Sequence, residues 1–300
     1  MIDFEADIYG QYARFSAVAD LLEISALRGK SVSVETAIDW LSDVGIKPRD
    51  DLLLTDDGLA DFDDGDAFEQ SAAIVFDLLR DRAQTLNELY PFEITTGDIR
   101  KRDIDSSVYA DVLALTLAHA YRIDTAPDRP TEVFERVVSN FFGERGWLSV
   151  HSGKFRGKFD ANLVKIGQAI QIEMHPSAAP KSRYENDGKV DVVANFPWLD
   201  DRQGRLTAIT QATLEKSSGW AKKANEPSPQ KWRSWMNDHV EPLVFFAVPH
   251  HIEPKHFVDL LQSSQAILLD RLRLVLSISE LPPETSTIRH HVETSELGID

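Results

Sequence analysis

A carboxylate and a polar pair within residues 187–216 have the types and spacing that metal-assisted cleavage of a phosphodiester requires. Asp191 opens one apolar run, and Gln211 and Thr213 end a second run that follows a polar turn. Carboxylate and amide oxygens are ligands for hard divalent ions such as Mg²⁺. Such an ion polarises a phosphate and lowers the pKa of an attacking water molecule. A nearby lysine commonly stabilises the charge that develops on the phosphate.

Two neighbouring strands and one helix would position these groups. The apolar pattern predicts strands over residues 189–196 and 205–213, joined by a turn at 200–204. We expect Asp191 on the first strand and the polar pair on the second to face the same side of the sheet. Upstream, a threonine that can act as an N-cap and a wide apolar face predict a helix over residues 131–143, which carries Glu135.

At these residues the chain resembles the PD-(D/E)xK restriction-endonuclease-like superfamily. Asp191 matches the aspartate of that motif, and Gln211-Ala212-Thr213 lies where the (D/E)xK element belongs. The helix with Glu135 resembles the helix that often supplies a further acidic ligand. More narrowly, the segment resembles bacterial proteins linked to phage defence. The positions that carry this narrower resemblance are Asp187, Asp191, Gln211, Thr213, Lys216, Trp220, Lys223 and Trp232.

The resemblance implies a metal-dependent DNA endonuclease that acts as the effector of an anti-phage defence system. The implied catalytic residues are Asp191, Gln211, Lys216 and Glu135. The implied ligands for Mg²⁺ or Mn²⁺ are Asp191, Glu135, Gln211 and Asp187. The implied nucleic-acid contacts are Lys216, Lys222 and Lys223. DNA and a protein component of the defence system are the implied partners, and self-association is left open.

Two positions depart from the superfamily motif. Gln211 replaces an acid, so it adds no charge, and metal affinity falls unless Glu135 or Asp187 compensates. Thr213 replaces the lysine, so we expect Lys216, or else the lysines at 222–223, to take that role. The alternative hypothesis is therefore a catalytically inactive nuclease-fold module that acts in sensing or in assembly of a defence complex.

The charge distribution limits where nucleic acid could bind. The net charge is −17, with −16 in residues 1–150, +3 in residues 151–250 and −4 in residues 251–300. Phosphates are attracted by lysine and arginine, so we expect any DNA contact in the middle region. A third hypothesis, that the acidic half mimics DNA, rests on charge alone. The chain has no cysteine, and we find no apolar run of membrane-spanning length and no secretory signal. We therefore expect a cytoplasmic protein.

The pattern along the chain predicts an α/β (α+β) protein with two domains. Residues 1–125 are expected to form a helical domain with the element order of a winged helix, and residues 126–300 a restriction-endonuclease-like mixed sheet flanked by helices. The acidic residues 51–68 are expected to form the wing, in a structural or protein-contacting role rather than on DNA. Residues 242–249 predict a strand buried on both faces, and residues 266–276 a helix that runs into a last strand. Trp220, Trp232 and Trp235 are expected in the core.

Overall fold

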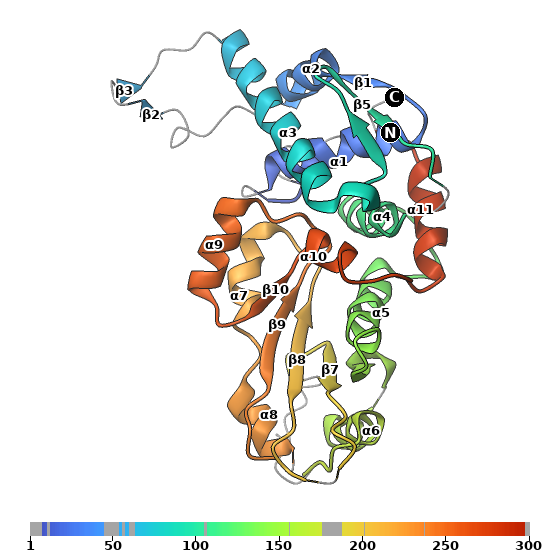
Figure 1. The fold of residues 1–300 in the computed structure, drawn as a ribbon, viewed down its shortest axis with the longest axis vertical. Coiled ribbons are helices and arrows are strands. Elements are labelled where there is room, and N and C mark those ends of the chain that lie inside the picture. Colours follow the sequence, from blue (N-terminus) through green and yellow to red (C-terminus); the bar gives the residue numbers. More distant parts are fainter. Residues whose placement is uncertain are drawn as a thin grey trace.

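The computed structural model consists of a group of helices with a small sheet and, beside it, a larger mixed sheet flanked by helices (Figure 1). The residues that it describes are 8–10, 13–44, 54–55, 58–59, 64–104, 107–155, 157–175, 188–200, 202–236 and 238–297. The α/β class with a mixed sheet between helices, as expected from the sequence, is confirmed.

The N-terminal elements are helices and short strands. They are α1 (Arg14–Leu27), β1 (Val32–Ser33), α2 (Val34–Val44), β2 (Leu54–Thr55), β3 (Gly58–Leu59), α3 (Asp64–Leu86), a 3₁₀ turn (Asn87–Leu89), β4 (Phe92–Ile94), β5 (Asp98–Lys101) and α4 (Val108–Ala120). Strands β1, β5 and β4 form an antiparallel sheet in that spatial order. Two serine side chains cap the N-termini of helices in this group. Ser33 Oγ accepts from the Thr36 N–H at the start of α2, and Ser107 Oγ accepts from the Ala110 N–H at the start of α4.

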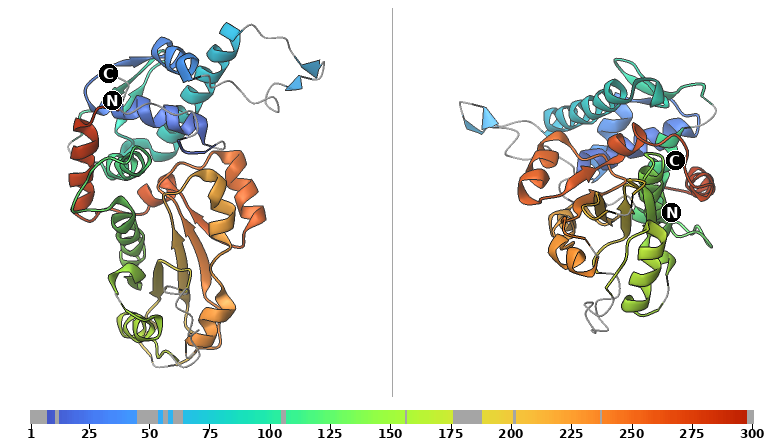
Figure 2. Two further views of the ribbon diagram at one scale, coloured as in Figure 1. Left: turned by 180° about the vertical axis from the view of Figure 1, so that it is seen from behind. Right: turned by 60° about the horizontal axis from the view of Figure 1, so that its bottom comes forward.

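The acidic stretch expected to form the wing contains one hairpin, and the small sheet contains another. The acidic stretch does contain a short hairpin, β2–β3, at the far end of α3 (Figures 1 and 2). The hairpin that belongs to the three-stranded sheet is β4–β5, however. Thr95 Oγ1 stabilises its turn by accepting from the Asp98 N–H at 3.0 Å. Strands β4 and β5 contribute the buried Phe92 and Ile99 to the core.

The larger sheet has the strand order β10-β9-β8-β7-β6 among the described residues. Its strands are β6 (Leu148–His151), β7 (Val192–Asn195), β8 (Thr207–Ala212), β9 (Leu243–Ala247) and β10 (Ile267–Leu269). Strands β6, β7 and β8 form an antiparallel meander, and β9 and β10 continue it in parallel. The α5–β6–β7–β8–helix–β9 sequence is consistent with a restriction-endonuclease-like core.

Because helices cover both faces of this sheet, the sequences of its central strands are mostly apolar and do not alternate between apolar and polar residues. All four residues of β7 are buried. One face packs with α5 (Pro130–Gly143), and the other packs with α6 (Phe159–Ile170) and α8 (Pro229–Trp235). The remaining elements are a 3₁₀ turn (Ser152–Lys154), a 3₁₀ turn (Ser217–Gly219), α7 (Trp220–Ala224), α9 (Pro254–Ser263), α10 (Arg271–Val275) and α11 (Glu284–Thr294).

Buried contacts join the two groups of elements. One apolar cluster contains Leu22 of α1, Leu117 of α4, Phe142 of α5 and Phe246 of β9. Helix α11, which follows the larger sheet in the chain, lies beside α4 of the N-terminal group (Figure 2). The division into residues 1–125 and 126–300 stays a prediction. No described helix is long and apolar enough to cross a membrane.

Two further expectations need correction. Residues 266–276 form a strand followed by a helix, the reverse of the expected order, because Asp270 ends β10 and caps α10 by accepting from the Arg273 N–H. Helix α5 begins at Pro130 with Arg129 at its N-cap position, so Thr131 is not the cap. The core position of the three tryptophans is confirmed, with Trp220, Trp232 and Trp235 at 4%, 0% and 3% exposure.

Candidate active site at the end of the meander

Asp191 and Gln211 are in direct contact across the β7–β8 ladder. The Asp191 N–H donates to the Thr210 carbonyl, which places Asp191 opposite Gln211 just before β7 begins. Gln211 Nε2 donates to Asp191 Oδ2 at 2.5 Å, and the Ala212 N–H donates to the same oxygen at 2.8 Å. Gln211 is 6% exposed. The amide therefore holds one carboxylate oxygen in a largely dry position between two strand ends.

The residues after β8 lead away from this contact. Thr213 is buried, its N–H donates to the Ala247 carbonyl, and its hydroxyl accepts from the Glu215 N–H at 3.1 Å. Lys216 is exposed, and the next N–H, that of Ser217, donates to the Tyr9 carbonyl at 2.8 Å. A Cβ at Gly10 would lie 3.3 Å from Lys216 Cβ. The N-terminal segment thus sets the position of Lys216.

The other predicted lysines lie on α7. Lys222 is exposed, whereas Lys223 Nζ lies 3.4 Å from Glu215 Oε1. Asp187, the fourth predicted ligand, lies outside the described residues. Neither lysine has a contact with Asp191 among the described hydrogen bonds and ion pairs.

Glu135 contacts the end of β6 rather than Asp191. Its Oε2 lies 3.8 Å from His151 Nδ1, a distance within reach of an ion pair if the imidazole is protonated but too long for a hydrogen bond. Both side chains are about one-fifth exposed, at 19% and 21%. The neighbouring Arg136 donates from Nη1 to Glu284 Oε1 at 2.6 Å, so its charge is already paired with α11.

The two pairs adjoin at one end of the meander. His151 ends β6 opposite Val192, and the following Ser152 N–H donates to the Asp191 carbonyl at 2.7 Å. Side chains alternate along a strand, so Asp191 and Gln211 share the face of Val193, whereas His151 shares the α5 face of Val192. Among the described residues no group of three or more His, Asp or Glu side chains is arranged to hold a metal ion. Three of the four predicted ligands thus lie at one sheet end, Asp191 paired with Gln211 and Glu135 paired with the unpredicted His151.

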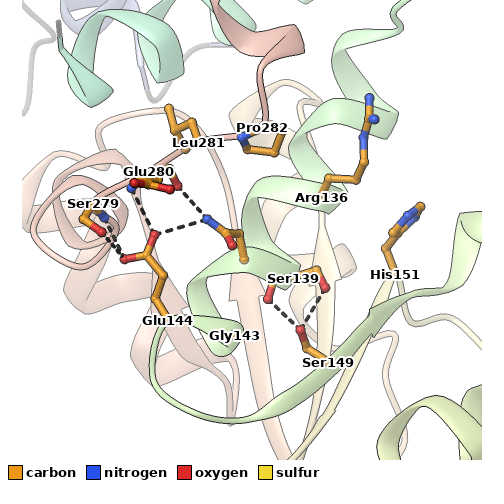
Figure 3. Close-up of a pocket in the computed structure, with 11 residues that line it drawn as sticks. Arg136, Ser139, Gly143, Glu144, Ser149, His151, Ser279, Glu280, Leu281 and Pro282 are labelled. Atoms are coloured by element: carbon orange, nitrogen blue, oxygen red, sulfur yellow. Dashed lines mark hydrogen bonds between the residues drawn. The ribbon is translucent and has the colours of Figure 1, made fainter.

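A groove of about 460 Å³ runs along α5 beside the edge strand β6. Figure 3 shows Arg136 and His151 at one side of it, with Ser139 and Ser149 hydrogen-bonded between α5 and β6. At its other end Glu144 accepts from the Ser279 N–H and hydroxyl, both at 2.8 Å, and these bonds keep the pKa of Glu144 low against the effect of burial. His151 belongs both to this groove and to the contact with Glu135.

The sequence did not identify His151 and Gly153 as candidate site residues. Residues 148–151 are too short and too mixed in polarity to predict a strand with assurance. The available signal was a histidine followed by Ser-Gly-Lys, between the helix with Glu135 and the strand with Asp191.

Comparison with known proteins gives little further support. No protein-family model matches the chain, and no curated protein sequence matches it. Among solved structures, that of restriction endonuclease FokI bound to DNA is similar over 89% of this chain, with 10% identity and a TM-score of 0.22. The chain spans 44% of that protein's length. A TM-score this low carries no argument about the fold of this chain.

Proposed function

We propose that this protein is a metal-dependent DNA endonuclease. The observation that supports this most is the contact between Asp191 and Gln211 at the facing ends of β7 and β8, in the positions of the two motif ligands. The order α5, β6, β7, β8, helix, β9 around that contact supports it as well.

The donor set fits a divalent ion. Asp191 supplies a carboxylate, and Gln211 can turn its amide so that Oε1 replaces Nε2 toward the metal. Glu135 lies at the same sheet end but on the α5 face, beside His151. A bound ion would polarise the scissile phosphate and lower the pKa of the attacking water. Asp191 is held in place for this by the Ala212 N–H, which does not depend on the amide orientation. Lys216 contributes positive charge toward the DNA backbone, together with Lys222 and Lys223 on α7.

The charge distribution and the resemblance supply the biological setting. The −17 net charge disfavours indiscriminate DNA binding. We therefore place the activity in the cytoplasm as the effector of a phage-defence system, with a protein partner that brings the chain to DNA.

A plasmid-cleavage assay tests the proposal. Purified full-length protein with Mg²⁺ or Mn²⁺ is expected to convert supercoiled DNA into nicked or linear forms, and Asp191→Asn is expected to remove this activity while the variant keeps its melting temperature within a few degrees. Intact plasmid in both metals, with a defence partner present, would sink the proposal.

A second candidate function is an inactive nuclease-fold module for sensing or assembly. It is favoured by the hydrogen bond from Gln211 to Asp191, which satisfies a carboxylate oxygen without any ion. Calorimetric titration separates the two functions: absence of Mg²⁺ and Mn²⁺ binding supports the inactive module, whereas binding that Asp191→Ala abolishes argues against it.

A further inference from the structure

Two buried polar atoms at the end of β6 face each other without hydrogen-bond partners. Glu135 Oε2 and His151 Nδ1 lie 3.8 Å apart, and neither has a partner among the described residues. Leaving a buried polar atom unsatisfied costs about 1–3 kcal/mol, so native structures pair nearly all of them. An ion or a water molecule between the two atoms would remove this cost.

Gly153 keeps the space beside these atoms open. A Cβ at this position would lie 2.7 Å from Glu135 Oε2 and 3.8 Å from His151 Nδ1. The backbone of Gly153 is outside the left-handed region, so its conformation does not require glycine. The small residue instead leaves room against the carboxylate.

We propose that Glu135 and His151 form a site for a transition-metal ion, and that this site prefers Mn²⁺ over Mg²⁺. Bonds of about 2.0–2.2 Å to an imidazole nitrogen and a carboxylate oxygen allow one ion to join atoms up to about 4 Å apart. Mg²⁺ takes oxygen ligands in a strict octahedron and keeps its waters, whereas an imidazole ligand favours transition metals. Binding through Nδ1 places the ring proton on Nε2.

The surroundings leave room for the other ligands of such an ion. His151 lines the groove of about 460 Å³ beside α5, which gives the ion a path from solvent. The adjacent Ser152 is bonded to Asp191, so the ion would lie next to the strand end that carries the other motif ligands. An ion here would lie on the α5 face, opposite Asp191 and Gln211, so it would be a second ion beside one held by that pair. That the nuclease uses it rests on the proposed function.

A Mn²⁺ titration of the full-length protein, followed by electron paramagnetic resonance, tests the site. The wild type is expected to bind Mn²⁺ at least tenfold more tightly than Mg²⁺, measured by competition. His151→Gln removes the nitrogen ligand and is expected to weaken Mn²⁺ binding at least tenfold. Gly153→Ala is expected to weaken it similarly, because the added methyl group displaces the carboxylate although no ligand is changed.

Two control variants should bind Mn²⁺ as the wild type does. Gly97→Ala adds a methyl group where nothing lies within 4 Å, and His290→Gln changes an exposed histidine on α11. Thermal unfolding of each variant shows whether the fold is kept. Absence of Mn²⁺ binding in the wild type, or equal binding by His151→Gln and Gly153→Ala, overturns the site.

Parallel DNA cleavage separates this inference from the proposed function. If Mn²⁺ binding depends on His151 and Gly153 but DNA stays intact, the metal site stands and the nuclease proposal fails. If DNA is cleaved but His151→Gln and Gly153→Ala bind Mn²⁺ with the affinity of the wild type, the nuclease proposal stands and the metal site fails.

Discussion

Glu23 on α1 and Glu135 on α5 are both helical glutamates beside a basic side chain, but their surroundings differ. Glu23 is fully buried, and both of its oxygens have partners. Oε1 accepts from the Tyr90 and Tyr109 hydroxyls at 2.5 and 2.8 Å, and Oε2 lies 2.9 Å from Arg82 Nη1. Glu135 is partly exposed, and its Oε2 has no hydrogen-bond partner among the described residues.

The other buried carboxylate beside Glu23 also has hydrogen-bond partners for both of its oxygens. Asp20, one turn earlier, accepts from Arg271 Nη1 and Nη2 at 2.7 and 2.6 Å, from Arg82 Nη1 at 2.8 Å and from the Tyr9 hydroxyl at 2.9 Å. Burial alone would raise the pKa of Asp20, but the two guanidinium groups hold it at about 2. This buried charge cluster connects α1, α3, α4 and α10, and so joins the N-terminal elements to the ends of β9 and β10.

The difference indicates what each region does. In the buried charge cluster the chain itself satisfies every carboxylate oxygen, and the cluster holds elements together, although Arg82 Nη2 has no hydrogen-bond partner among the described residues. Where buried atoms of a glutamate and a histidine lack partners, a ligand can supply them. The predictions below test this contrast between the buried charge cluster and the end of β6.

Removing an arginine from the buried charge cluster should give the largest effect on stability. Arg271→Ala leaves Asp20 buried with half of its positive partners, and breaking a buried pair costs about 3–5 kcal/mol. Urea unfolding followed by circular dichroism measures the loss. A loss below about 1 kcal/mol would show that the cluster is not what joins the two groups of elements.

Asp111 on α4 predicts a pH-dependent effect of intermediate size. Burial raises its pKa from 3.8 to about 6, and the charge of Arg289 offsets this only in part. Because the folded state binds the proton more tightly, the ionised carboxylate reduces stability above pH 6, and this cost disappears as the pH falls toward 4.

Asp111→Asn is therefore expected to be more stable than the wild type at pH 7, by about 1–3 kcal/mol. The advantage should shrink toward zero near pH 4. Urea midpoints of both proteins at pH 4, 5, 6 and 7 provide the measurement, and a constant difference across this range would contradict the assignment.

Gln211→Glu restores the acid of the motif and tests whether the end of the sheet binds a metal ion. Without metal, two carboxylates would face each other where an amide now donates to Asp191, so we expect a lower melting temperature. With Mn²⁺ or Mg²⁺ the extra charge should raise affinity by about tenfold, or about 1.4 kcal/mol. Calorimetry and thermal unfolding with and without metal report both effects, and unchanged affinity would remove Gln211 from the ligand set.

The exposed ion pair between Arg80 and Asp77 provides the small-effect reference. Their side chains are 50% and 73% exposed at a separation of 2.5 Å. Solvent screening limits such pairs to about 0–1 kcal/mol, so Arg80→Ala should shift the urea midpoint little. A shift as large as that of Arg271→Ala would mean that burial does not explain the contrast.

The sequence predicted that Asp191 and Gln211 lie on the same face of neighbouring strands, because side chains alternate along a strand. The observed register places the two residues opposite each other. The apolar run of residues 266–276 was assigned in the wrong order because periodicity cannot distinguish a short buried strand from a helix. Asp270, a good N-cap residue, was the unused signal.

Longer-range features could not be predicted. Lys216 is positioned by the Tyr9–Ser217 contact, which joins residues more than two hundred positions apart in the chain. The pairing of Arg271 with Asp20 depends on a similar separation. His151 reaches Glu135 only because β6 packs beside α5. The sequence of β6 is short and mixed in polarity, so it does not predict a strand.

The most direct test of the central claim is the rate of DNA cleavage as a function of Mn²⁺ concentration, measured for the wild type, His151→Gln and Asp191→Asn at equal folded fractions. We predict Mn²⁺-dependent cleavage by the wild type, a half-maximal rate at a higher Mn²⁺ concentration for His151→Gln, and no cleavage by Asp191→Asn. Cleavage by Asp191→Asn at the wild-type rate, or none by the wild type at any Mn²⁺ concentration, would contradict the claim that this sheet end is a metal-dependent nuclease site.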